Sequence, residues 1–265
     1  VEIKYLISKS NYGKKISDIY PGLYDKNYPK LTKFTNINWN DLDVIFLCLP
    51  SGKSKKIVKK VPKSIFIIDL SNDFRSISLS KKRSIEATWT YGLADHLEKF
   101  LLEKEEYSKS IKNISNPGCY STSILLPLIP LLSNKIISSD DIIIDSKSGI
   151  TGAGKQNITE NLFSEINNSI RPYKIAKHKH VEEIELCLSL HNLGKKITIS
   201  FTPQVIPINR GISSNIYVKL EKGKAIKHVK KYFENNKFKF LRILKQGQIP
   251  LIKDVIGTNY CLFNV

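Results

Sequence analysis

The first part of the chain alternates near-continuous apolar runs with polar turns and one basic, helix-periodic segment at residues 53–61. Apolar runs without strict polar alternation are typical of strands in a parallel sheet that is covered on both faces. The strands expected on this pattern are residues 1–7, 43–49, 64–70 and 112–115. We therefore predict an α/β domain with a parallel sheet over residues 1–116.

The pattern changes after residue 116, where strands and helices no longer alternate strictly. Helices are expected at residues 120–133, 158–167, 181–190 and 225–235, and strands at residues 141–146, 197–206, 212–220, 240–244 and 255–265. Pro127 and Pro130 lie inside the first of these helices and predict a kink or an early stop. This order of elements predicts an α+β second domain over residues 117–265.

Polar segments follow the first three expected strands: Ser8-Lys9-Ser10, Pro50-Ser51-Gly52 and Asp73-Phe74-Arg75. Ligands of open α/β sheets bind beyond the carboxyl ends of the strands. The fourth strand leads to Cys119. We therefore expect these segments and Cys119 to share one edge of the sheet.

Cys119 stands in the stretch Ser115-Asn116-Pro117-Gly118-Cys119-Tyr120, between two apolar segments. A thiol at the start of a helix faces unpaired N–H groups and the positive end of the helix dipole, which lower its pKa and favour the thiolate. Pro117 makes a rigid turn, and Gly118 allows a ligand to approach the backbone. A buried cysteine beside a turn is the alternative, but this lead-in favours a functional thiol.

Two histidines, His178 and His180, precede the helix expected at 181–190, with Glu183 a short step beyond. A thiol, an imidazole and an orienting carboxylate together activate a nucleophile. On an extended segment the two rings would point to opposite sides, so only one would reach Cys119. A solvated basic loop is an equal alternative on spacing alone, and no third ligand is spaced to complete a zinc site.

The formal net charge of +18, from 42 Lys and Arg against 24 Asp and Glu, is compatible with nucleic acid or with small anionic substrates. The lysines are spread along the whole chain rather than gathered in one stripe, which favours the small anions. The four cysteines form no C-x-x-C pair, and no apolar run is long enough to span a bilayer. We expect a cytoplasmic protein without a membrane or nucleic-acid partner.

Several short stretches, taken in order, resemble the motifs of one enzyme family. They are Leu49-Pro50-Ser51-Gly52-Lys53-Ser54, Asp69-Leu70-Ser71-Asn72-Asp73-Phe74-Arg75, Tyr91-Gly92-Leu93, Ser115-Asn116-Pro117-Gly118-Cys119-Tyr120, Ser148-Gly149-Ile150-Thr151-Gly152-Ala153-Gly154-Lys155, His178-Lys179-His180-Val181-Glu182-Glu183-Ile184, Phe201-Thr202-Pro203 and Asn209-Arg210-Gly211. Over essentially the whole chain the sequence resembles the N-acetyl-gamma-glutamyl-phosphate reductase family of arginine biosynthesis. Ser51 stands where the family has His, and Glu182 where it has Pro.

This resemblance implies an NADP-binding Rossmann-type domain followed by a catalytic domain like that of glyceraldehyde-3-phosphate dehydrogenase. It implies that Cys119 attacks the acyl phosphate of N-acetyl-L-glutamyl 5-phosphate and forms a thioester, which NADPH reduces to the semialdehyde. His180 or His178 would transfer the protons, and Glu183 would help to shape the site. A homo-oligomer, dimer or tetramer, is expected.

The resemblance also assigns binding residues. Arg75 and Arg210 are the candidates for the phosphate and carboxylate of the substrate, because guanidinium pairs bidentately with both. Asn116 and Tyr173 complete the substrate set. The cofactor candidates are Ser8, Lys9, Ser10, Pro50, Ser51, Gly52, Ser148, Gly149 and Gly152. The first three of these follow the opening strand, where the 2′-phosphate of NADP would lie, and no metal is expected.

The chain contains no methionine, and residue 1 already lies in a strand-like run, so we expect a piece of a longer protein. The family's first strand and its G-x-x-G-x-x-G loop would precede Val1. A segment that touches the nicotinamide would follow Val265. On this basis we expect residues 1–265 alone to bind NADP poorly.

Other functions stay open at this point. A reductase of carrier-bound aminoadipyl phosphate in lysine synthesis shares the thiol mechanism. Aspartate-semialdehyde dehydrogenase is more distant, because its cysteine motif lacks the Gly-Cys-Tyr run. A cysteine acyltransferase or hydrolase would use the same Cys and His without consuming NADPH, and a nucleic-acid-binding protein would show steep salt dependence.

Overall fold

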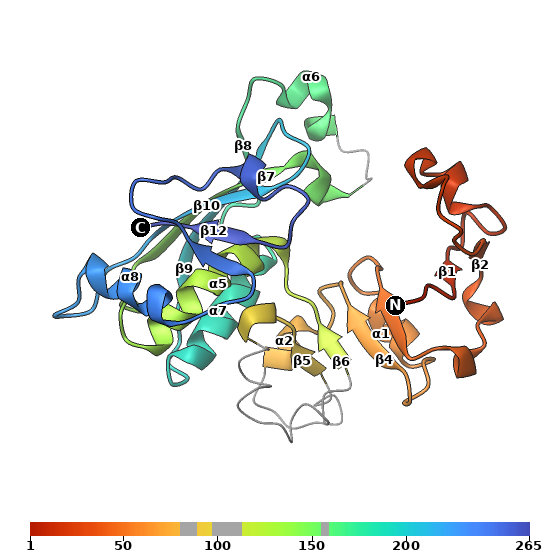
Figure 1. Ribbon diagram of the computed structural model, residues 1–265, viewed down its shortest axis with the longest axis horizontal. Coiled ribbons are helices and arrows are strands. Elements are labelled where there is room, and N and C mark those ends of the chain that lie inside the picture. Colours follow the sequence, from red (N-terminus) through yellow and green to blue (C-terminus); the bar gives the residue numbers. More distant parts are fainter. Residues whose placement is uncertain (80–88, 97–112, 155–158) are drawn as a thin grey trace.

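The computed structural model describes residues 1–79, 89–96, 113–154 and 159–265. Two domains lie side by side, with the N-terminal segment at one end of the molecule and helix α8 (Ile226–Asn235) near the other (Figure 1). β6 (Asn113–Ser115) leads through a short turn directly into α5 (Cys119–Ser133). The expected α/β architecture is confirmed.

The first domain contains a four-stranded sheet with the order β3-β4-β6-β5, in which all three pairings are parallel. Its elements are β3 (Val44–Leu47), α1 (Ser54–Val58), β4 (Phe66–Asp69), α2 (Arg75–Leu79), β5 (Trp89–Tyr91) and β6 (Asn113–Ser115). The predicted parallel sheet is therefore confirmed. Sequence reasoning missed α2 and β5, because each is too short to show a period.

The opening strand is shorter than expected and belongs to another sheet. β1 (Leu6–Ile7) pairs in parallel with β2 (Leu31–Thr32), which sequence reasoning missed, and the two form a sheet of their own. Figure 1 shows this pair apart from the four-stranded sheet. The prediction that Ser8-Lys9-Ser10 shares one sheet edge with the other polar segments was therefore wrong.

At its edge strand β3, the four-stranded sheet leaves one face exposed. Along β3, Ile45 and Leu47 are buried, whereas Val44 and Phe46 are 39% and 58% exposed. Because side chains alternate along a strand, a sheet with one covered face exposes every second residue. On the buried face the rings of Phe74 and Trp89 stack with centroids 3.8 Å apart.

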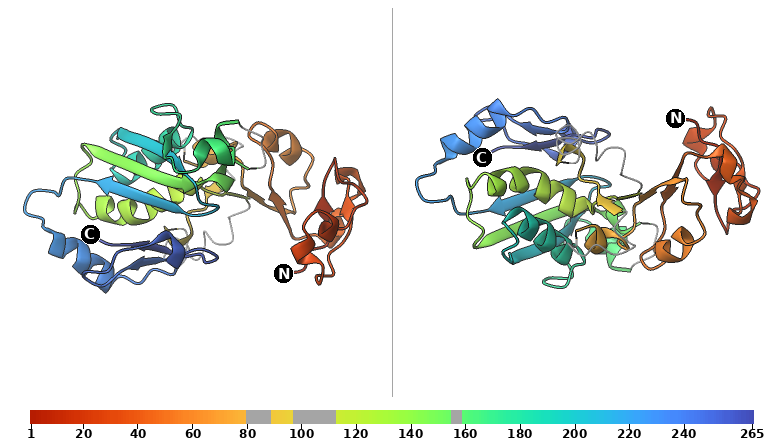
Figure 2. Two further views of the ribbon diagram at one scale, coloured as in Figure 1. Left: turned by 90° about the horizontal axis from the view of Figure 1, so that it is seen from above. Right: turned by 90° about the horizontal axis from the view of Figure 1, so that it is seen from below.

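The second domain contains a mixed sheet with the order β10-β7-β9-β8. β7 (Ile142–Gly149) and β9 (Ile199–Ile206) are parallel, while β8 (Arg171–Pro172) and β10 (Ile212–Tyr217) pair with them antiparallel. Helices α5 (Cys119–Ser133) and α7 (His180–His191) lie side by side on one face of this sheet (Figure 2). The main core of the molecule fills the space between these helices and the sheet.

Helix α5 runs through both of its prolines without stopping, so the early stop expected there was wrong. Each proline removes one backbone hydrogen bond and costs about 3 kcal/mol in a helix interior. Ile124, Leu125 and Ile129 are fully buried on the same helix, and each contributes about 1.5–3 kcal/mol by leaving water. Burial of the helix therefore offsets the local cost of the prolines.

The rest of the domain follows the expected order with shorter elements. These are α6 (Phe163–Ile166), α8, β11 (Leu241–Ile243), a 3-10 turn at Ile252–Asp254 and β12 (Cys261–Phe263). β11 and β12 pair in parallel. The strand expected over residues 255–265 is reduced to β12, and residue 158 of the helix expected at 158–167 lies outside the described residues.

The carboxylate of Asp95 joins the segment after β5 to the start of β11. Asp95 is buried and accepts hydrogen bonds from the backbone N–H groups of Lys239, Phe240 and Leu241, with donor–acceptor distances of 2.7–3.1 Å. Hydrogen bonds to a charged acceptor are the stronger class. Asp95 therefore acts as a clamp on the start of β11.

We expect Asp95→Asn to lower the free energy of unfolding by about 2–3 kcal/mol, because the amide presents one acceptor atom where the carboxylate presents two. Urea denaturation followed by circular dichroism measures the change. Asp25→Asn is the matched control, since Asp25 only pairs with Lys26 on the surface and such pairs contribute little. An unfolding midpoint equal to that of the control would show that the clamp does not stabilise the fold.

Candidate active site

Cys119 is the first residue of α5, and Gly118 is its N-cap. The Gly118 carbonyl accepts hydrogen bonds from the N–H and the side-chain hydroxyl of Thr122, at 2.8 and 2.9 Å. These bonds close the first helical turn. The thiol therefore lies at the N-terminal end of a buried helix, as predicted, and the residue remains in contact with solvent.

The pKa of the Cys119 thiol is raised, because the protein packed around the sulfur disfavours the charged form. The backbone N–H groups of Tyr120 and Cys119 oppose this effect, as do the charges of Arg75 and Lys179. Burial outweighs them, so the expected lowering of the pKa was wrong. A thiol in this state needs a base to become a nucleophile.

His178 and His180 lie together, not on opposite sides. Their ring centroids are 4.6 Å apart, and both rings pack edge-on against Tyr120, at 5.5 and 5.9 Å. The expectation failed because Lys179 adopts a helical conformation, with φ −57° and ψ −21°. This turn lets the backbone N–H of His180 donate to Nδ1 of His178 at 3.2 Å.

Both imidazoles are held neutral. Burial lowers the pKa of His178 to about 4 and that of His180 to about 2, with further lowering of the former by Lys174 and Lys179 and of the latter by His178, Arg75 and Lys179. His178 accepts at Nδ1, so its proton is on Nε2, which lies 3.4 Å from the hydroxyl of Tyr173. Each neutral ring therefore has one nitrogen that bears no proton, and in His178 this is Nδ1, which accepts the His180 N–H.

Glu183 contacts the cysteine turn and not the histidine rings. Its Oε1 accepts from the Gly118 N–H at 2.8 Å and from the Tyr91 hydroxyl at 2.7 Å, and its Oε2 pairs with Nη1 of Arg75 at 3.0 Å. In the expected Cys–His–Glu arrangement the carboxylate orients a histidine. Among the described residues, Glu183 instead bonds to Arg75, Tyr91 and Gly118. The carboxylate orients the backbone beside the thiol.

Arg75 is buried, and its guanidinium faces protein acceptors. Nε donates to the Asn116 carbonyl at 2.9 Å, and Nη2 donates to the Leu70 carbonyl at 3.2 Å. Nη1 also lies 3.5 Å from Nε2 of His180. This geometry favours a positioning role for Arg75 over the substrate-binding role expected.

The Gly-rich loop after β7 packs on the segment between β9 and β10. The Gly149 N–H donates to the Gly211 carbonyl at 3.0 Å, and a Cβ on Gly149 would lie 2.7 Å from the Asn209 carbonyl oxygen. Burial raises the pKa of the Tyr120 hydroxyl, and the nearby Ser148 side chain opposes this rise. The structure thus places this loop against the residue that follows Cys119, with Arg210 exposed nearby.

Tyr173 and Tyr120 extend the site. The Tyr173 hydroxyl donates to that of Tyr120 at 3.3 Å, which donates to the Gln204 carbonyl at 3.1 Å. The Asn116 side chain donates to the Pro117 carbonyl at 3.2 Å. Tyr91, Tyr120 and Lys179 were missed as site residues, although all three stood inside motif stretches, because only the fold brings them to Cys119.

Pro50-Ser51-Gly52 lies at the carboxyl end of β3, as expected. The Gly52 N–H donates to Asp73 at 2.5 Å, its φ is +84°, and no atom lies within 4 Å of where a Cβ would stand. The backbone is therefore open to a ligand on this side. Ser8, Lys9 and Ser10 follow β1 in the separate sheet, where the Ser8 N–H donates to Thr32.

Comparison with known proteins identifies this arrangement. The family models for the semialdehyde dehydrogenase NAD binding domain and dimerisation domain match residues 1–101 and 119–265. The N-acetyl-gamma-glutamyl-phosphate reductase of Brachyspira hyodysenteriae is 41% identical, over 98% of this chain and 78% of the relative. Those of Alkaliphilus metalliredigens and Ehrlichia canis are 39% and 36% identical, over 98% and 100% of this chain and 77% and 78% of their own lengths. The chain belongs to the N-acetyl-gamma-glutamyl-phosphate reductase family.

Solved structures show how the fold of this reductase family member is related to others. Aspartate semialdehyde dehydrogenase II from Vibrio cholerae superposes with a TM-score of 0.72 at 14% identity, over 98% of this chain and 78% of that one. The Candida albicans enzyme, solved with NADP, gives 0.68 at 16% identity, over 98% and 80%. At these identities the likeness establishes the shared fold.

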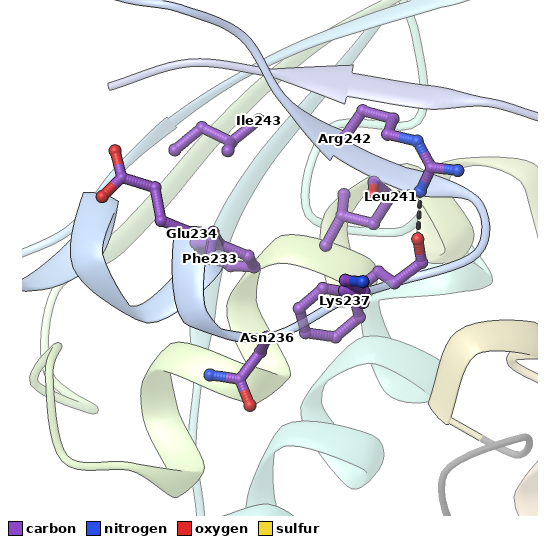
Figure 3. A pocket seen from close by; sticks show the side chains of 8 residues that line it. Phe233, Glu234, Asn236, Lys237, Leu241, Arg242 and Ile243 are labelled. Atoms are coloured by element: carbon purple, nitrogen blue, oxygen red, sulfur yellow. Dashed lines mark hydrogen bonds between the residues drawn. The ribbon is translucent and has the colours of Figure 1, made fainter.

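The described part of the second domain contains cavities on either side of the C-terminal segment. One, of about 760 Å³, is bounded by α5, β10 and residues 249–265, and its lining includes Cys119, Thr122 and Ser123. The other, of about 310 Å³, lies between α8 and β11 and is lined by residues such as Lys237 and Arg242 (Figure 3). The larger cavity opens onto the thiol, because Cys119 is among its lining residues. Among the described residues no helix is both long and apolar enough to cross a membrane.

Proposed function

We propose that this protein reduces N-acetyl-L-glutamyl 5-phosphate to N-acetyl-L-glutamate 5-semialdehyde with release of phosphate, in L-arginine biosynthesis. The observation that carries the proposal is the Cys119 turn beside two neutral imidazoles, in a chain 34–41% identical to reductases of this name. The alternatives of a carrier-bound aminoadipyl substrate and of a hydrolase or acyltransferase are not favoured by these relatives.

The first half of the reaction uses the chain's own groups. An imidazole of the His178/His180 pair takes the thiol proton of Cys119, and the sulfur attacks the acyl carbon. The bond from carbon to the phosphate oxygen breaks, the imidazolium returns its proton to the leaving phosphate, and a thioester remains on Cys119. The raised pKa of the thiol is the reason that this step needs a base, and each neutral ring has one nitrogen that bears no proton.

The backbone N–H groups of Cys119 and Tyr120 are placed to stabilise the negative oxygen in both halves of the reaction. They are the first amides of α5, and a helix provides no internal acceptor for its first N–H groups. Both already interact with the Cys119 sulfur. One such donor contributes about 3–4 kcal/mol to transition-state stabilisation.

NADPH, when bound, supplies the hydride that reduces the thioester. The residues that we propose to hold it are the open backbone at Pro50-Ser51-Gly52 and the loop containing Ser148, Gly149 and Gly152. We propose Ser8, Lys9 and Ser10 for its 2′-phosphate. The lysine supports a preference for NADP over NAD, since it can pair with that phosphate. On release of the aldehyde, Cys119 leaves as the thiolate and takes up a proton from solvent, because the imidazole pair has already given its proton to the phosphate.

For the substrate we propose Arg210 as the cation that binds its phosphate or carboxylate, because this side chain is exposed beside the Gly-rich loop. Asn116 and Tyr173 complete the contacts, and the cavity of about 760 Å³ beside Cys119 accommodates an acyl chain. We further propose a dimer or tetramer in a reducing, cytoplasmic compartment. The domain boundary is proposed at residues 116 and 117.

The test is turnover of the full-length protein in the reverse direction, with phosphate, NADP or NAD, and one aldehyde at a time. N-acetyl-L-glutamate 5-semialdehyde should drive NADPH formation at least about tenfold faster than aspartate semialdehyde or the carrier-bound aminoadipate semialdehyde. In the forward direction, release of acid from the acyl phosphate without consumption of NADPH would instead identify a hydrolase. Faster turnover of another semialdehyde would overturn the substrate assignment.

A further inference from the structure

The residues Arg75, Glu183 and Tyr91, named here the Glu183 bracket, meet at the junction of the two domains. Arg75 comes from α2 and Tyr91 from β5, both in the first domain, whereas Glu183 comes from α7 in the second. The Glu183 side chain is 2% exposed and that of Arg75 is 7% exposed. The junction therefore contains a buried ion pair that links the domains.

The bracket contacts both ends of the turn that carries the nucleophile. Arg75 donates from Nε to the Asn116 carbonyl at 2.9 Å, and Glu183 accepts the Gly118 N–H at 2.8 Å. The Arg75–Glu183 ion pair at 3.0 Å connects these two contacts. Tyr91 donates to the same Glu183 oxygen that accepts from Gly118, at 2.7 Å. The turn is thereby held on both sides, one residue before Cys119.

A buried ion pair is not explained by stability alone. Removing two charges from water costs several kcal/mol per ion, and an apolar pair of similar volume is often as stable or more so. The hydrogen bonds to the turn do what an apolar pair could not, because they fix the direction of the Gly118 N–H and the Asn116 carbonyl. Misplacing a reacting group by about 1 Å can lower a rate about 100-fold.

We propose that Arg75, Glu183 and Tyr91 are positioning residues that hold the Asn116–Gly118 turn, and with it Cys119, in its attacking position at the domain junction. The inference rests on the proposed thiol mechanism. It replaces two roles expected from the sequence, in which Arg75 binds substrate and Glu183 orients a histidine.

The charges around Cys119 allow a test that does not depend on enzyme turnover, because they determine the pKa of the thiol. Arg75 on α2 and Lys179 before α7 favour the thiolate, while Tyr120 and Tyr173 are neutral and His178 and His180 are uncharged. Glu183→Gln leaves the Arg75 charge unpaired, so the thiol pKa should fall. Arg75→Gln removes that charge and leaves the carboxylate unpaired, so the thiol pKa should rise.

The experiment measures the rate of Cys119 alkylation by iodoacetamide against pH in the full-length protein. Peptide mass spectrometry separates Cys119 from the exposed Cys48. The midpoint is the pH at which the alkylation rate is half of its maximum. We expect it to fall in Glu183→Gln and to rise in Arg75→Gln. In steady-state kinetics both variants should lose about 100-fold in kcat, with KM changed less than about threefold, because the substrate contacts remain.

Arg75→Lys and Tyr91→Phe cover the case in which a charge-removing variant fails to fold. Arg75→Lys should keep the alkylation midpoint of the wild type and recover part of kcat, and Tyr91→Phe should lower kcat about tenfold through one lost hydrogen bond. Ser76→Ala is the matched control, because the Ser76 hydroxyl donates to Glu182 at 3.4 Å between the same two helices, α2 and α7, on the exposed side of the junction.

Midpoints that move in the same direction, or wild-type kcat in folded Glu183→Gln, would overturn the proposal. A wild-type protein without reductase turnover would refute the proposed function instead. The alkylation midpoints would still report on the bracket in that case, so the two failures are distinguishable.

Discussion

Replacing Cys119 by Ser should lower reductase turnover of the full-length protein by at least about a thousand-fold, because the hydroxyl cannot supply the sulfur nucleophile that forms the thioester. The thiol is the first residue of α5 and remains in contact with solvent, so the exchange changes the nucleophile and leaves the fold intact. Coupled measurement of phosphate-dependent NADPH formation gives the rate, and circular dichroism checks the fold.

Cys48→Ser is the control for the loss of a thiol, because Cys48 is also an exposed, free cysteine. It should retain wild-type turnover. A second readout is the acyl-enzyme itself: denaturing mass spectrometry after mixing with substrate and without NADPH should show the added acyl mass only when Cys119 is present. Substantial turnover by Cys119→Ser would remove the thioester route.

Replacing Gly118 by Ala should lower kcat by about 100-fold, although only one methyl group is added. A Cβ at this position would lie 2.4 Å from Nε2 of His180 and within 2.7 Å of two ring carbons. The φ of Gly118 is −67°, which any residue adopts, so backbone strain is not the cause. The ring must move away from Cys119, or the turn must move away from Glu183.

Gly22→Ala is the matched control, since no atom lies within 4 Å of its Cβ position. It should leave kcat unchanged within about twofold. A crystal structure of Gly118→Ala would show which of the two groups has moved. Wild-type kcat in a folded Gly118→Ala would mean that the His180 ring is free to shift and does not act from the position described here.

The elements with a clear apolar pattern were predictable. β3, β4, β7, β9 and β10 fall inside their expected ranges or within three residues of them, and α5 ends at the expected residue. Short elements such as β2, β5, β8 and α2 were not, because two to five residues contain no measurable period. Their strands form only through pairing with partners far away in the chain.

The chemical composition of the site was also predictable, but its geometry was not. Cys119, His178, His180 and Glu183 were all named, and the structure brings them together around Gly118 and Tyr120. The two histidine rings lie together because Lys179 has a helical conformation. Arg75 pairs with Glu183 because α2 meets α7 across the domain junction. Neither is visible in residue spacing.

The sequence by itself determined the parallel sheet of the first domain, the change of pattern near residue 116 and the thiol at the start of α5, because hydrophobic period and turn residues act locally. The family motifs, read in order, determined the class of reaction. The tertiary structure alone decided that the thiol pKa is raised, that the imidazoles are adjacent and neutral, and that Arg75 pairs with Glu183. The physical reason is that burial, ionisation and ion pairing depend on every group packed around a residue, and those groups come from distant parts of the chain.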